Sequence, residues 1–456
     1  MEISLTNRIT DGVIWKELIK YCIPIAVGTL FQQLYNVVDA IIVGQYLGKE
    51  ALAAVGGSAS MLAIIIVEFF SGLTAGASVV ISQYYGAKEG DKVDEAMHTA
   101  FAGAIISGLV MGVAGFLSTR WMLTLMKTPA DTMELSVDYL KIYFIGLVAT
   151  LTYNMGAAVM RAIGDAKRPL YYLVLCSFVN IVLDILFVVV FKWGIKGAAY
   201  ATVIAQIVSC IMMMYSLMNS YVDVKLELRK IKIGTSMLMR ELRIGIPGGL
   251  QFCISGITNM MIQTAINGFG TDVTAGWAAY NKVDLFYWMI LSSYGAATTT
   301  FVGQNYGAKK VKRVLKTSHS AMLISLVTGT IMLVVLVNYA EGLMSIFTKD
   351  MAVVEAGSSM LYFMAPLYII YIFMEIPSGV LRGLGYTFWP MIFNMFTMIG
   401  LRIPWLLFIV PAHHTVNTVL LSYPVAIVTA IVLIDIYYLK IMKKVKRELA
   451  ESEIAA

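Results

Sequence analysis

The chain has few charged residues, few cysteines and few histidines. Only 14% of its 456 residues are charged, whereas 59% are hydrophobic, and the mean hydropathy is +0.77. A soluble chain of this length would need more charge on its surface, so the composition indicates a polytopic membrane protein. The four cysteines fall at or within apolar segments and the four histidines lack metal-ligand spacing. These absences exclude a disulfide framework and a zinc site of the usual kind.

Long apolar segments fill most of the chain. A helix of about 20 residues, at about 1.5 Å per residue, crosses the hydrocarbon core of a bilayer. Tryptophans stand near several segment ends (Trp15, Trp121, Trp193 and Trp389), as in the aromatic belt of a membrane protein. The sequence predicts twelve membrane-spanning helices, at 21–44, 52–84, 94–118, 134–160, 169–191, 196–218, 245–268, 274–304, 316–338, 353–381, 388–410 and 415–440.

Basic residues are distributed unevenly between the predicted loops. With a cytoplasmic N-terminus, the inner segments carry 25 Lys/Arg, the outer loops carry 6, and 3 lie within spans. The positive-inside rule then predicts cytoplasmic termini, and we expect a plasma-membrane location. The net charge of +6 reflects this topology and does not indicate nucleic-acid binding, although the basic tail at 443–447 suits anionic lipid. Six charges within the first twenty residues argue against a cleavable signal peptide.

Two halves of the chain repeat each other. SQYYGAK at 82–88 returns as GQNYGAK at 303–309, and RAIGDAKRP at 161–169 returns as RGLGYTFWP at 382–390, both at an offset of 221 residues. Each copy holds six predicted spans, so both copies enter the membrane from the same side. We expect an N-terminal lobe at 1–218, a cytoplasmic linker at 219–243, a C-terminal lobe at 244–440 and a basic tail at 441–456. The glycines of the repeated motifs are expected to close helices.

The first span, 23–44, carries a single charge. A carboxylate in such a segment costs ~2.5 kcal/mol or more to insert, so it has to face a bundle interior, a watery cavity or a cation. Gln32 and Asn36 share a helix face with that residue, Asp39. A polar stripe that only packs helices together is the alternative. The carboxylate favours an ion or proton site.

The fifth span adds a second buried acid. Asn180 and Asp184 are four residues apart, and Ser177 joins their face. At about 1.5 Å per residue, Asp39, Asp184 and Thr202 all lie ~8–10 Å from the outer ends of their spans. Two carboxylates with amide and hydroxyl oxygens suit Na⁺ or a proton shared by two acids. Taken alone, Thr202 is better explained by a bond to its own helix.

The second half differs from the first at these positions. Ile262 stands opposite Asp39, and Trp405 stands opposite Asp184. Glu375 is the counterpart of Asn154, and it is expected either to bind a cationic substrate or to be a neutral buried acid. Lys141 and Lys282 are expected to pair with nearby acids such as Asp138 and Asp284. The predicted substrate cleft comprises Gln32, Asn36, Asn259, Gln263 and Glu375.

The ordered motifs resemble those of a known family. LFQQLYNVVDAIIVGQYLG, SQYYGAK/GQNYGAK, MRAIGDAKRP and NIVLD, set within twelve spans and two repeats, resemble the multidrug and toxic compound extrusion (MATE) transporters. The resemblance implies an all-α protein with a V-shaped pair of six-helix lobes. It also implies antiport of organic compounds against Na⁺ or H⁺. Coupling residues carry over to Asp39, Asn154, Asn180, Asp184, Thr202 and Tyr139, with Asp39, Asn180 and Asp184 as the candidate Na⁺ ligands. The acid that one branch of the family has early in the seventh span is absent, and Gln251 is the polar residue there.

The sequence therefore predicts a secondary antiporter that exports small organic compounds by alternating access. A lipid-linked sugar flippase of the same superfamily, a membrane-embedded enzyme and a channel are the alternatives. An enzyme is disfavoured because HExxH, GxSxG and paired His/Cys ligands are absent. We expect no cofactor besides the coupling ion. The expected partners are organic substrates, Na⁺ or H⁺ and membrane lipid, with no nucleic acid, and the chain is expected to be a monomer.

Overall fold

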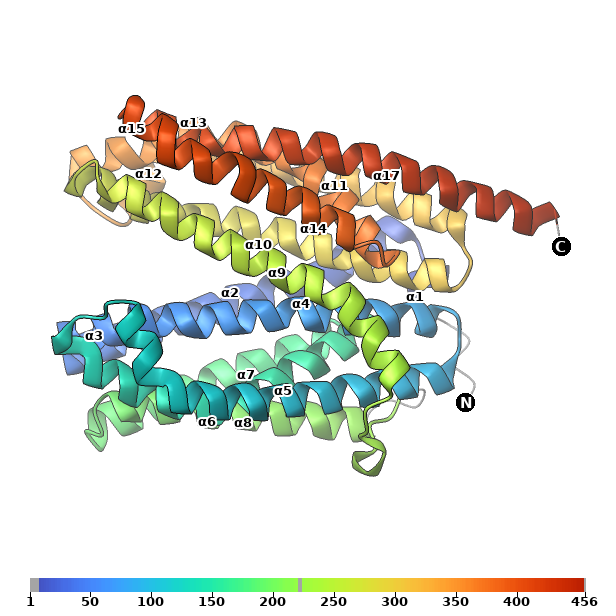
Figure 1. Cartoon of the computed structure of the whole chain (residues 1–456), viewed down its shortest axis with the longest axis horizontal. Coiled ribbons are helices and arrows are strands. Elements are labelled where there is room, and N and C mark those ends of the chain that lie inside the picture. Colours follow the sequence, from blue (N-terminus) through green and yellow to red (C-terminus); the bar gives the residue numbers. More distant parts are fainter. Residues whose placement is uncertain (1–7, 220–223, 455–456) are drawn as a thin grey trace. The chain divides into compact units, whose positions relative to one another are not determined.

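The structure is a computed structural model that describes residues 8–219 and 224–454, and these residues form helices without strands. Long helical segments follow the twelve predicted spans in order (Figure 1). They are α2 (Ile14–Leu47), α3 and α4 (Lys49–Gly56, Ser58–Gly86), α5 (Gly90–Leu125), α6 (Ala130–Ala162), α7 with η1 (Lys167–Asp184, Ile185–Val190), α8 (Ile195–Asn219), α9 (Thr235–Asn267), α10 (Thr271–Gly307), α11 (Val311–Asn338), α13 (Met351–Gly383), α14 to α15 (Phe388–Met395 to Val410–Ala412), and α16 with α17 (Val416–Leu420, Ser422–Ile454).

Ten helical segments among the described residues are long and apolar enough to cross a membrane. The chain is therefore a multi-pass membrane protein of the all-α class, as predicted. The ten do not include α9 and α10, which are 33 and 37 residues long. The second of these helices carries Asp272, Lys282 and Asp284 within its length. Short helices (α1, Arg8–Asp11; η2, Leu228–Lys230; α12, Ala340–Ser345) join or precede the long ones.

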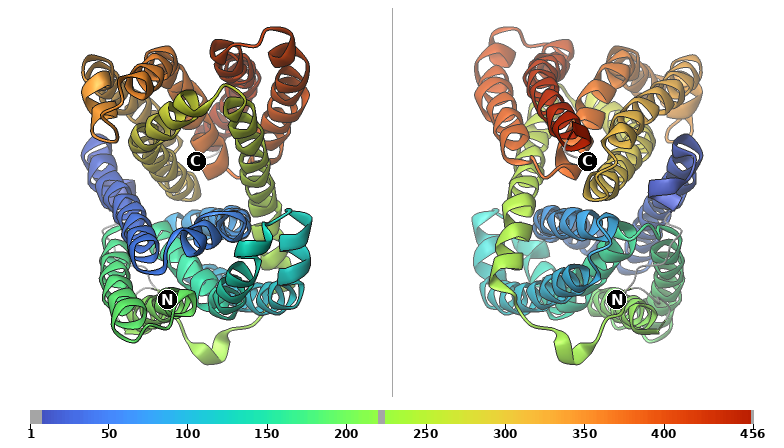
Figure 2. Two further views of the ribbon diagram at one scale, coloured as in Figure 1. Left: turned by 90° about the vertical axis from the view of Figure 1, so that its left-hand side faces the viewer. Right: turned by 90° about the vertical axis from the view of Figure 1, so that its right-hand side faces the viewer.

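The helices gather into two compact units. Unit 1 is built from 23–249, and unit 2 from 6–22 together with 250–456. Within each unit the helices run roughly parallel (Figure 2). In unit 1, α6 packs against α4, α5 and α8; in unit 2, α13 packs against α10, α11 and α17. The boundaries between the units fall inside α2 and α9, whereas the sequence-based boundaries were placed in the linker.

The first helix of each repeat is shared between the two units. The beginning of α2 belongs to unit 2, where the Tyr21 hydroxyl donates to Thr300 Oγ1 at 3.3 Å. Likewise α1 is held in unit 2, because Arg313 donates to the carbonyls of Ile9 and Gly12 at 3.0 and 2.7 Å. The beginning of α9 belongs to unit 1 instead. Each unit therefore completes its bundle with the start of the helix that opens the other repeat.

Glycines make room for the beginning of α9 in unit 1. A Cβ built on Gly72 of α4 would lie 1.9 Å from the backbone nitrogen of Gly249, and one on Gly76 would lie 2.6 Å from that of Gly245. Backbone atoms cannot move aside as a flexible side chain can. The two helices therefore approach each other closely only because both carry glycine along the contact.

The repeated motifs do close helices, but not always through glycine. In RAIGD and RGLGY the glycines Gly164 and Gly385 take φ of 100° and 87°. In the two GAK motifs the lysines do so instead, Lys88 with φ 59° and Lys309 with φ 57°. The GAK glycines Gly86 and Gly307 are the last residues of α4 and α10, as expected, but the left-handed position falls two residues later.

Two of the long segments turn from α-helix to π-helix midway. In unit 1 the change follows Asp184, where η1 begins. In unit 2 it produces η3 (Phe396–Arg402) and η4 (Trp405–Ile409). Turns of π-helix are rare and often occur at functional sites. Asp184 directly precedes η1, and Arg402 is the last residue of η3.

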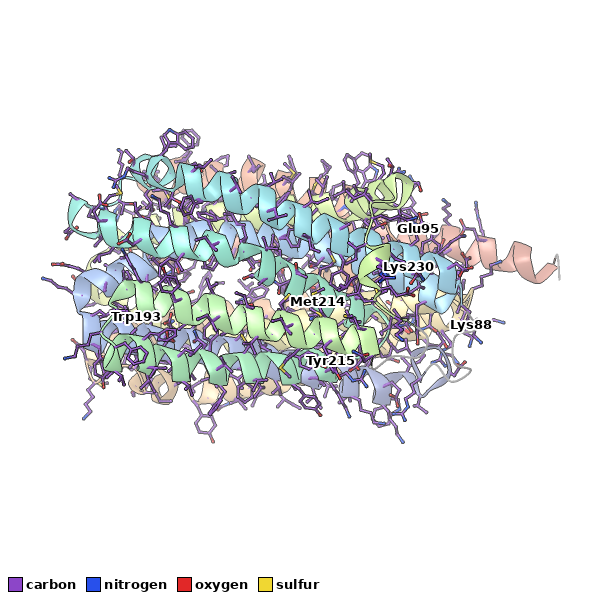
Figure 3. All side chains as sticks on the ribbon, turned by 90° about the horizontal axis from the view of Figure 1, so that it is seen from below. Lys88, Glu95, Trp193, Met214, Tyr215 and Lys230 are labelled. Carbon is purple, nitrogen blue, oxygen red and sulfur yellow. The ribbon has the colours of Figure 1, made fainter. Side chains whose placement is uncertain are left out.

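The ends of unit 1 carry different side chains. Lys88 and Lys230 lie toward one end and Trp193 toward the opposite end (Figure 3). The belt tryptophans named above are all exposed. At the lysine end the linker is tied to α5, because the amide of Glu227 donates to His98 Nε2 at 3.0 Å. The exposure of these tryptophans is consistent with the predicted aromatic belt.

Candidate functional site

Polar side chains from four helices of unit 1 meet in its interior. Asp39 comes from α2, Tyr139 from α6, Asn180 and Asp184 from α7, and Thr202 from α8. Asp39 and Asp184 are close enough to interact electrostatically. The structure thus brings together the residues that the sequence placed at one depth. Their assignment to ion coupling stays a prediction.

These polar groups are withdrawn from water. Asp39 is 8% exposed, Asn180 1% and Asp184 0%. Asp39 Oδ1, Asn180 Oδ1 and both carboxyl oxygens of Asp184 have no hydrogen-bond partner. Four buried oxygens without donors in one place are costly unless a proton or a cation joins them.

Hydroxyl groups border the carboxyl pair. Asn180 Nδ2 donates to Thr202 Oγ1 at 3.5 Å, and Thr202 Oγ1 donates to the Ala198 carbonyl at 3.1 Å. The expected bond of Thr202 to its own helix is therefore present, alongside a contact to the site. Tyr139 lies within hydrogen-bonding reach of Thr202 and within electrostatic range of Asp39 and Asp184.

Sequence reasoning missed one neighbour of the pair. Tyr35 lies on α2 one turn before Asp39 and is within electrostatic range of Asp39 and Tyr139. Its spacing of four residues from Asp39 was the available signal. Two tyrosines therefore flank the carboxylates. Each tyrosine hydroxyl can donate a hydrogen bond to a carboxylate or accept a hydrogen bond from a protonated carboxyl group.

The arrangement suits a small monovalent ligand. Two carboxylates held this close repel each other when both are ionised, so a shared proton or one hard cation stabilises them. Oxygens are the ligands that Na⁺ and other hard cations prefer. Among the described residues, no group of three or more His, Cys, Asp and Glu side chains could hold a metal ion. Binding of a proton or an alkali cation at this pair stays a prediction.

A protein-family model matches both halves of the chain. The model described as MatE matches residues 24–186 and 247–407, one match in each repeat. The chain belongs to the MatE family. Curated relatives are described as multidrug resistance and multidrug export proteins. Together with the family match, this makes the chain a transporter and not an enzyme.

Curated relatives of this MatE protein cover almost its whole length. The probable multidrug resistance protein YoeA of Bacillus subtilis is 26% identical over 450 residues, which is 96% of each chain. The probable multidrug resistance protein YpnP of the same organism is 29% identical over 398 residues, covering 87% of this chain and 88% of the relative.

Solved structures share the fold. A multidrug resistance MATE family transporter of the MOP superfamily, in an outward-facing conformation, matches with a TM-score of 0.89 at 22% identity. A MOP superfamily transporter from Pyrococcus furiosus matches with a TM-score of 0.88 at 23% identity. Each comparison covers 98% of this chain and 100% of the other. At this identity the likeness concerns the fold.

Glu375 in unit 2 has an ionic partner in this MatE protein. Arg382 Nη2 donates to Glu375 Oε1 at 3.4 Å, along α13. A Cβ on Gly295 of α10 would lie 1.9 Å from the same oxygen, so the glycine leaves the space that the carboxylate fills. The sequence predicted that Glu375 binds a cationic substrate or is a neutral buried acid, and it did not predict a pairing with the arginine two helical turns later.

The remaining predicted substrate residues are accessible to different degrees. Gln32 and Asn36 are exposed on unit 1, as is Asn259 on unit 2. Gln263 is half-buried and donates to Asn267 Oδ1 at 2.7 Å. Asn154 is half-buried on α6. Their assignment to a substrate cleft, and that of Asn154 to the coupling network, stay predictions.

Two expected ion pairs have other partners. Asp138 pairs with Lys196 at 3.2 Å, while Lys141 lies over the ring of Phe116 at 5.3 Å from its centroid. The expected pairing of Asp138 with Lys141 is therefore wrong. A lysine three residues away on the same helix is available, but the start of α8 brings a lysine closer.

Asp284 is held by aromatic residues instead of Lys282. Trp288 Nε1 donates to Asp284 Oδ2 at 2.7 Å, and the Tyr368 hydroxyl donates to Oδ1. The hydroxyls of Tyr280 and Tyr368 lie 3.2 Å apart. The expected ion pair is therefore replaced by a network of neutral donors around the Asp284 carboxyl group.

Proposed function

We propose that this MatE protein is a secondary antiporter that exports organic compounds in exchange for H⁺ or Na⁺ by alternating access. Unit 1 binds the coupling ion between Asp39 and Asp184, with Asn180, Thr202 and Tyr139 as further polar groups and Asn154 as an extension. The observation that carries this proposal is the buried carboxyl pair with unsatisfied oxygens. The proposal places a monomer in the plasma membrane with both termini in the cytoplasm.

The names of the relatives support the export of drugs. The curated relatives are described as multidrug resistance or multidrug export proteins, and a family model matches both repeats. A duplicated fold is the usual basis of alternating access, because the two repeats can move against each other around a binding site.

The test removes one carboxylate at a time. We expect Asp39→Asn and Asp184→Asn each to abolish gradient-driven efflux of fluorescent organic cations from proteoliposomes, because a neutral amide cannot exchange the coupling charge. Asp138→Asn is the matched control: it makes the same change in unit 1 at a half-exposed residue paired with Lys196. Efflux at the wild-type rate by either variant of the pair would remove that residue from the coupling site.

The choice between H⁺ and Na⁺ has its own measurement. A cation that binds between the two carboxylates must displace the proton they share, so Na⁺ and H⁺ compete if both are ligands. We expect infrared difference spectra of the purified protein to lose carboxyl signal on addition of Na⁺, and Asp184→Asn to abolish that change. Spectra that respond to pH but not to Na⁺ would assign the site to protons alone.

Substrate binding is proposed for Gln32, Asn36, Asn259, Gln263 and Glu375. Glu375 is the only acidic residue of this set, so it is proposed to attract organic cations. Its pairing with Arg382 means that a cationic compound has to compete with an arginine that is already in place.

A further inference from the structure

Arg402 is a buried residue of unit 2 that the proposed function does not use. It ends η3, is 4% exposed, and its guanidinium carbon lies 3.7 Å from the centroid of the Tyr423 ring. Nη1 donates only to Met398 Sδ, at 3.5 Å, which is a weak acceptor. Nε and Nη2 have no hydrogen-bond partner. A buried guanidinium without a carboxylate is strongly destabilising, so its presence calls for a ligand.

Two carboxylates of unit 2 share tyrosine neighbours with Arg402 but are already engaged. Asp284 accepts hydrogen bonds from Trp288 and Tyr368. Glu375 has another arginine as its partner, as described above. In the described part of the chain neither acid pairs with Arg402. The guanidinium therefore has no ionic partner among the described residues of unit 2.

The repeat places this charge at the level of the carboxyl site. The offset of 221 residues pairs Trp405 with Asp184, and Tyr423 with Thr202. Arg402 precedes Trp405 by three residues, so it lies within about one helical turn of the position equivalent to Asp184. Asp184 directly precedes η1 and Arg402 is the last residue of η3, so both lie at an end of a π-helical segment. Unit 2 thus has a cation where unit 1 has its acids.

The unpaired atoms define the ligand. Nε and Nη2 form one edge of the guanidinium, and this edge binds a carboxylate with two parallel hydrogen bonds. One face of the guanidinium is covered by Tyr423, which is itself half-buried, and Tyr371 lies within electrostatic range. Aromatic surface beside a cation suits an amphipathic molecule that carries a carboxylate.

We propose that Arg402 binds the carboxylate of organic compounds that this transporter carries, so that its substrates include organic anions or zwitterions. That the ligand is a transported compound rests on the function proposed above. The binding of a carboxylate at Arg402 does not, because it requires neither an ion gradient nor the Asp39–Asp184 pair.

The experiment compares a carboxylate probe with its neutral ester. Full-length protein in nanodiscs of zwitterionic lipid is titrated with pyrenebutyrate and with its methyl ester, and binding is followed by fluorescence anisotropy. We expect the wild type to prefer the carboxylate.

Arg402→Gln should weaken carboxylate binding at least about tenfold and leave ester binding unchanged. Arg402→Lys should retain part of the preference, because it keeps the charge but loses the fork. Arg120→Gln, at an exposed arginine paired with Glu134, should behave as wild type.

Several outcomes would overturn the proposal. If the wild type binds the ester as tightly as the carboxylate, this result alone overturns the proposal. An Arg402→Gln protein that keeps the carboxylate preference would also do so. If phosphatidylglycerol in the nanodiscs displaces the probe from the wild type, the site belongs to a lipid headgroup and not to a substrate. Asp184→Asn should keep the preference. A wild type that shows the preference but no gradient-driven efflux would contradict only the proposed antiport.

Discussion

At the scale of single residues, the ionic partner of a buried acid decides what the acid can do. Among the described residues, Asp39 and Asp184 have each other and neutral groups as interacting neighbours, and the proposed exchange of protons or cations depends on this. Glu375 has Arg382 at 3.4 Å, which stabilises its ionised form. The side chains of this pair are 18% and 28% exposed, respectively, so the pair is only partly withdrawn from water and its attraction is partly screened.

Glu375→Gln tests whether the negative charge of this pair recruits cations. We expect affinity for organic cations to fall roughly tenfold and affinity for neutral compounds to stay close to wild type, because only the charge is removed. The Na⁺ or H⁺ response of the protein should be unchanged. Glu355→Gln, an exposed glutamate on the same helix, is the control. Equal losses for cationic and neutral compounds, measured by binding titration, would assign Glu375 to structure or coupling.

The sequence identified acids in spans more reliably than it identified their partners. A carboxylate within an apolar helix is conspicuous because its insertion is costly, so Asp39 and Asp184 were found from spacing alone. Partners on other helices depend on packing, which a single sequence does not reveal. This is why the Trp288 and Tyr368 donors to Asp284, and the lack of a partner for Arg402, became visible only in the structure.

At the scale of helices, the contact between α4 and the beginning of α9 depends on missing side chains. Gly72 and Gly76 face Gly249 and Gly245 so closely that the backbones are nearly in contact. Because apolar side chains gain little from each other over lipid, close backbone approach is a main source of stability between membrane helices. A single methyl group at this contact should therefore be costly.

Gly72→Ala should destabilise unit 1 by about 3 kcal/mol or more. The new methyl group would meet the backbone of Gly249 at 1.9 Å, and the helices would have to separate. Unfolding by a denaturing detergent, followed by circular dichroism, measures the change. Gly256→Ala on α9 is the control, since a Cβ there meets nothing within 4 Å. Because alanine favours a helix interior over glycine, Gly256→Ala should raise the free energy of unfolding by roughly 0.5–1 kcal/mol. Equal effects of the two variants would contradict the argument.

The GAK lysines offer a stabilising change. Lys309 takes φ 57°, a conformation that costs a non-glycine residue about 1 kcal/mol. Lys309→Gly should therefore raise the free energy of unfolding by up to about 1 kcal/mol. Lys309→Ala removes the same side chain but keeps the Cβ, so it should give no gain. If both variants gain equally in the detergent unfolding assay, the lysine charge and not the backbone is responsible.

Periodicity and length predicted the helices better than their internal irregularities. All twelve predicted spans coincide with helical segments because apolar length is a strong signal. The π-helical turns after Asp184 and around Arg402 had no signal in the sequence, since one extra residue in a turn changes neither composition nor length noticeably. The left-handed lysine of GAK was missed because glycine is the usual residue at such a position.

At the scale of the whole molecule, the repeat and the charge bias together set the topology. Even numbers of spans in each repeat bring both halves into the membrane in the same direction. Within unit 1, Lys88 and Lys230 lie toward one end and Trp193 toward the other. Basic ends are retained in the cytoplasm during insertion, so one orientation is favoured over its inverse.

Cytoplasmic termini have a direct test in intact cells. Lys349 belongs to an expected outer loop and Lys309 to an expected inner loop. Replacing each by cysteine gives a matched pair of variants. We expect Lys349→Cys to react with a membrane-impermeant maleimide in intact cells, and Lys309→Cys to react only after permeabilisation. Three of the native cysteines are buried and Cys253 is half-buried, and a Cys253→Ala background lowers the remaining signal.

The bias of 25 to 6 basic residues is larger than single substitutions can invert. Labelling of Lys309→Cys but not Lys349→Cys in intact cells would mean that the protein is inserted the other way round, with the carboxyl pair nearer the cytoplasmic side.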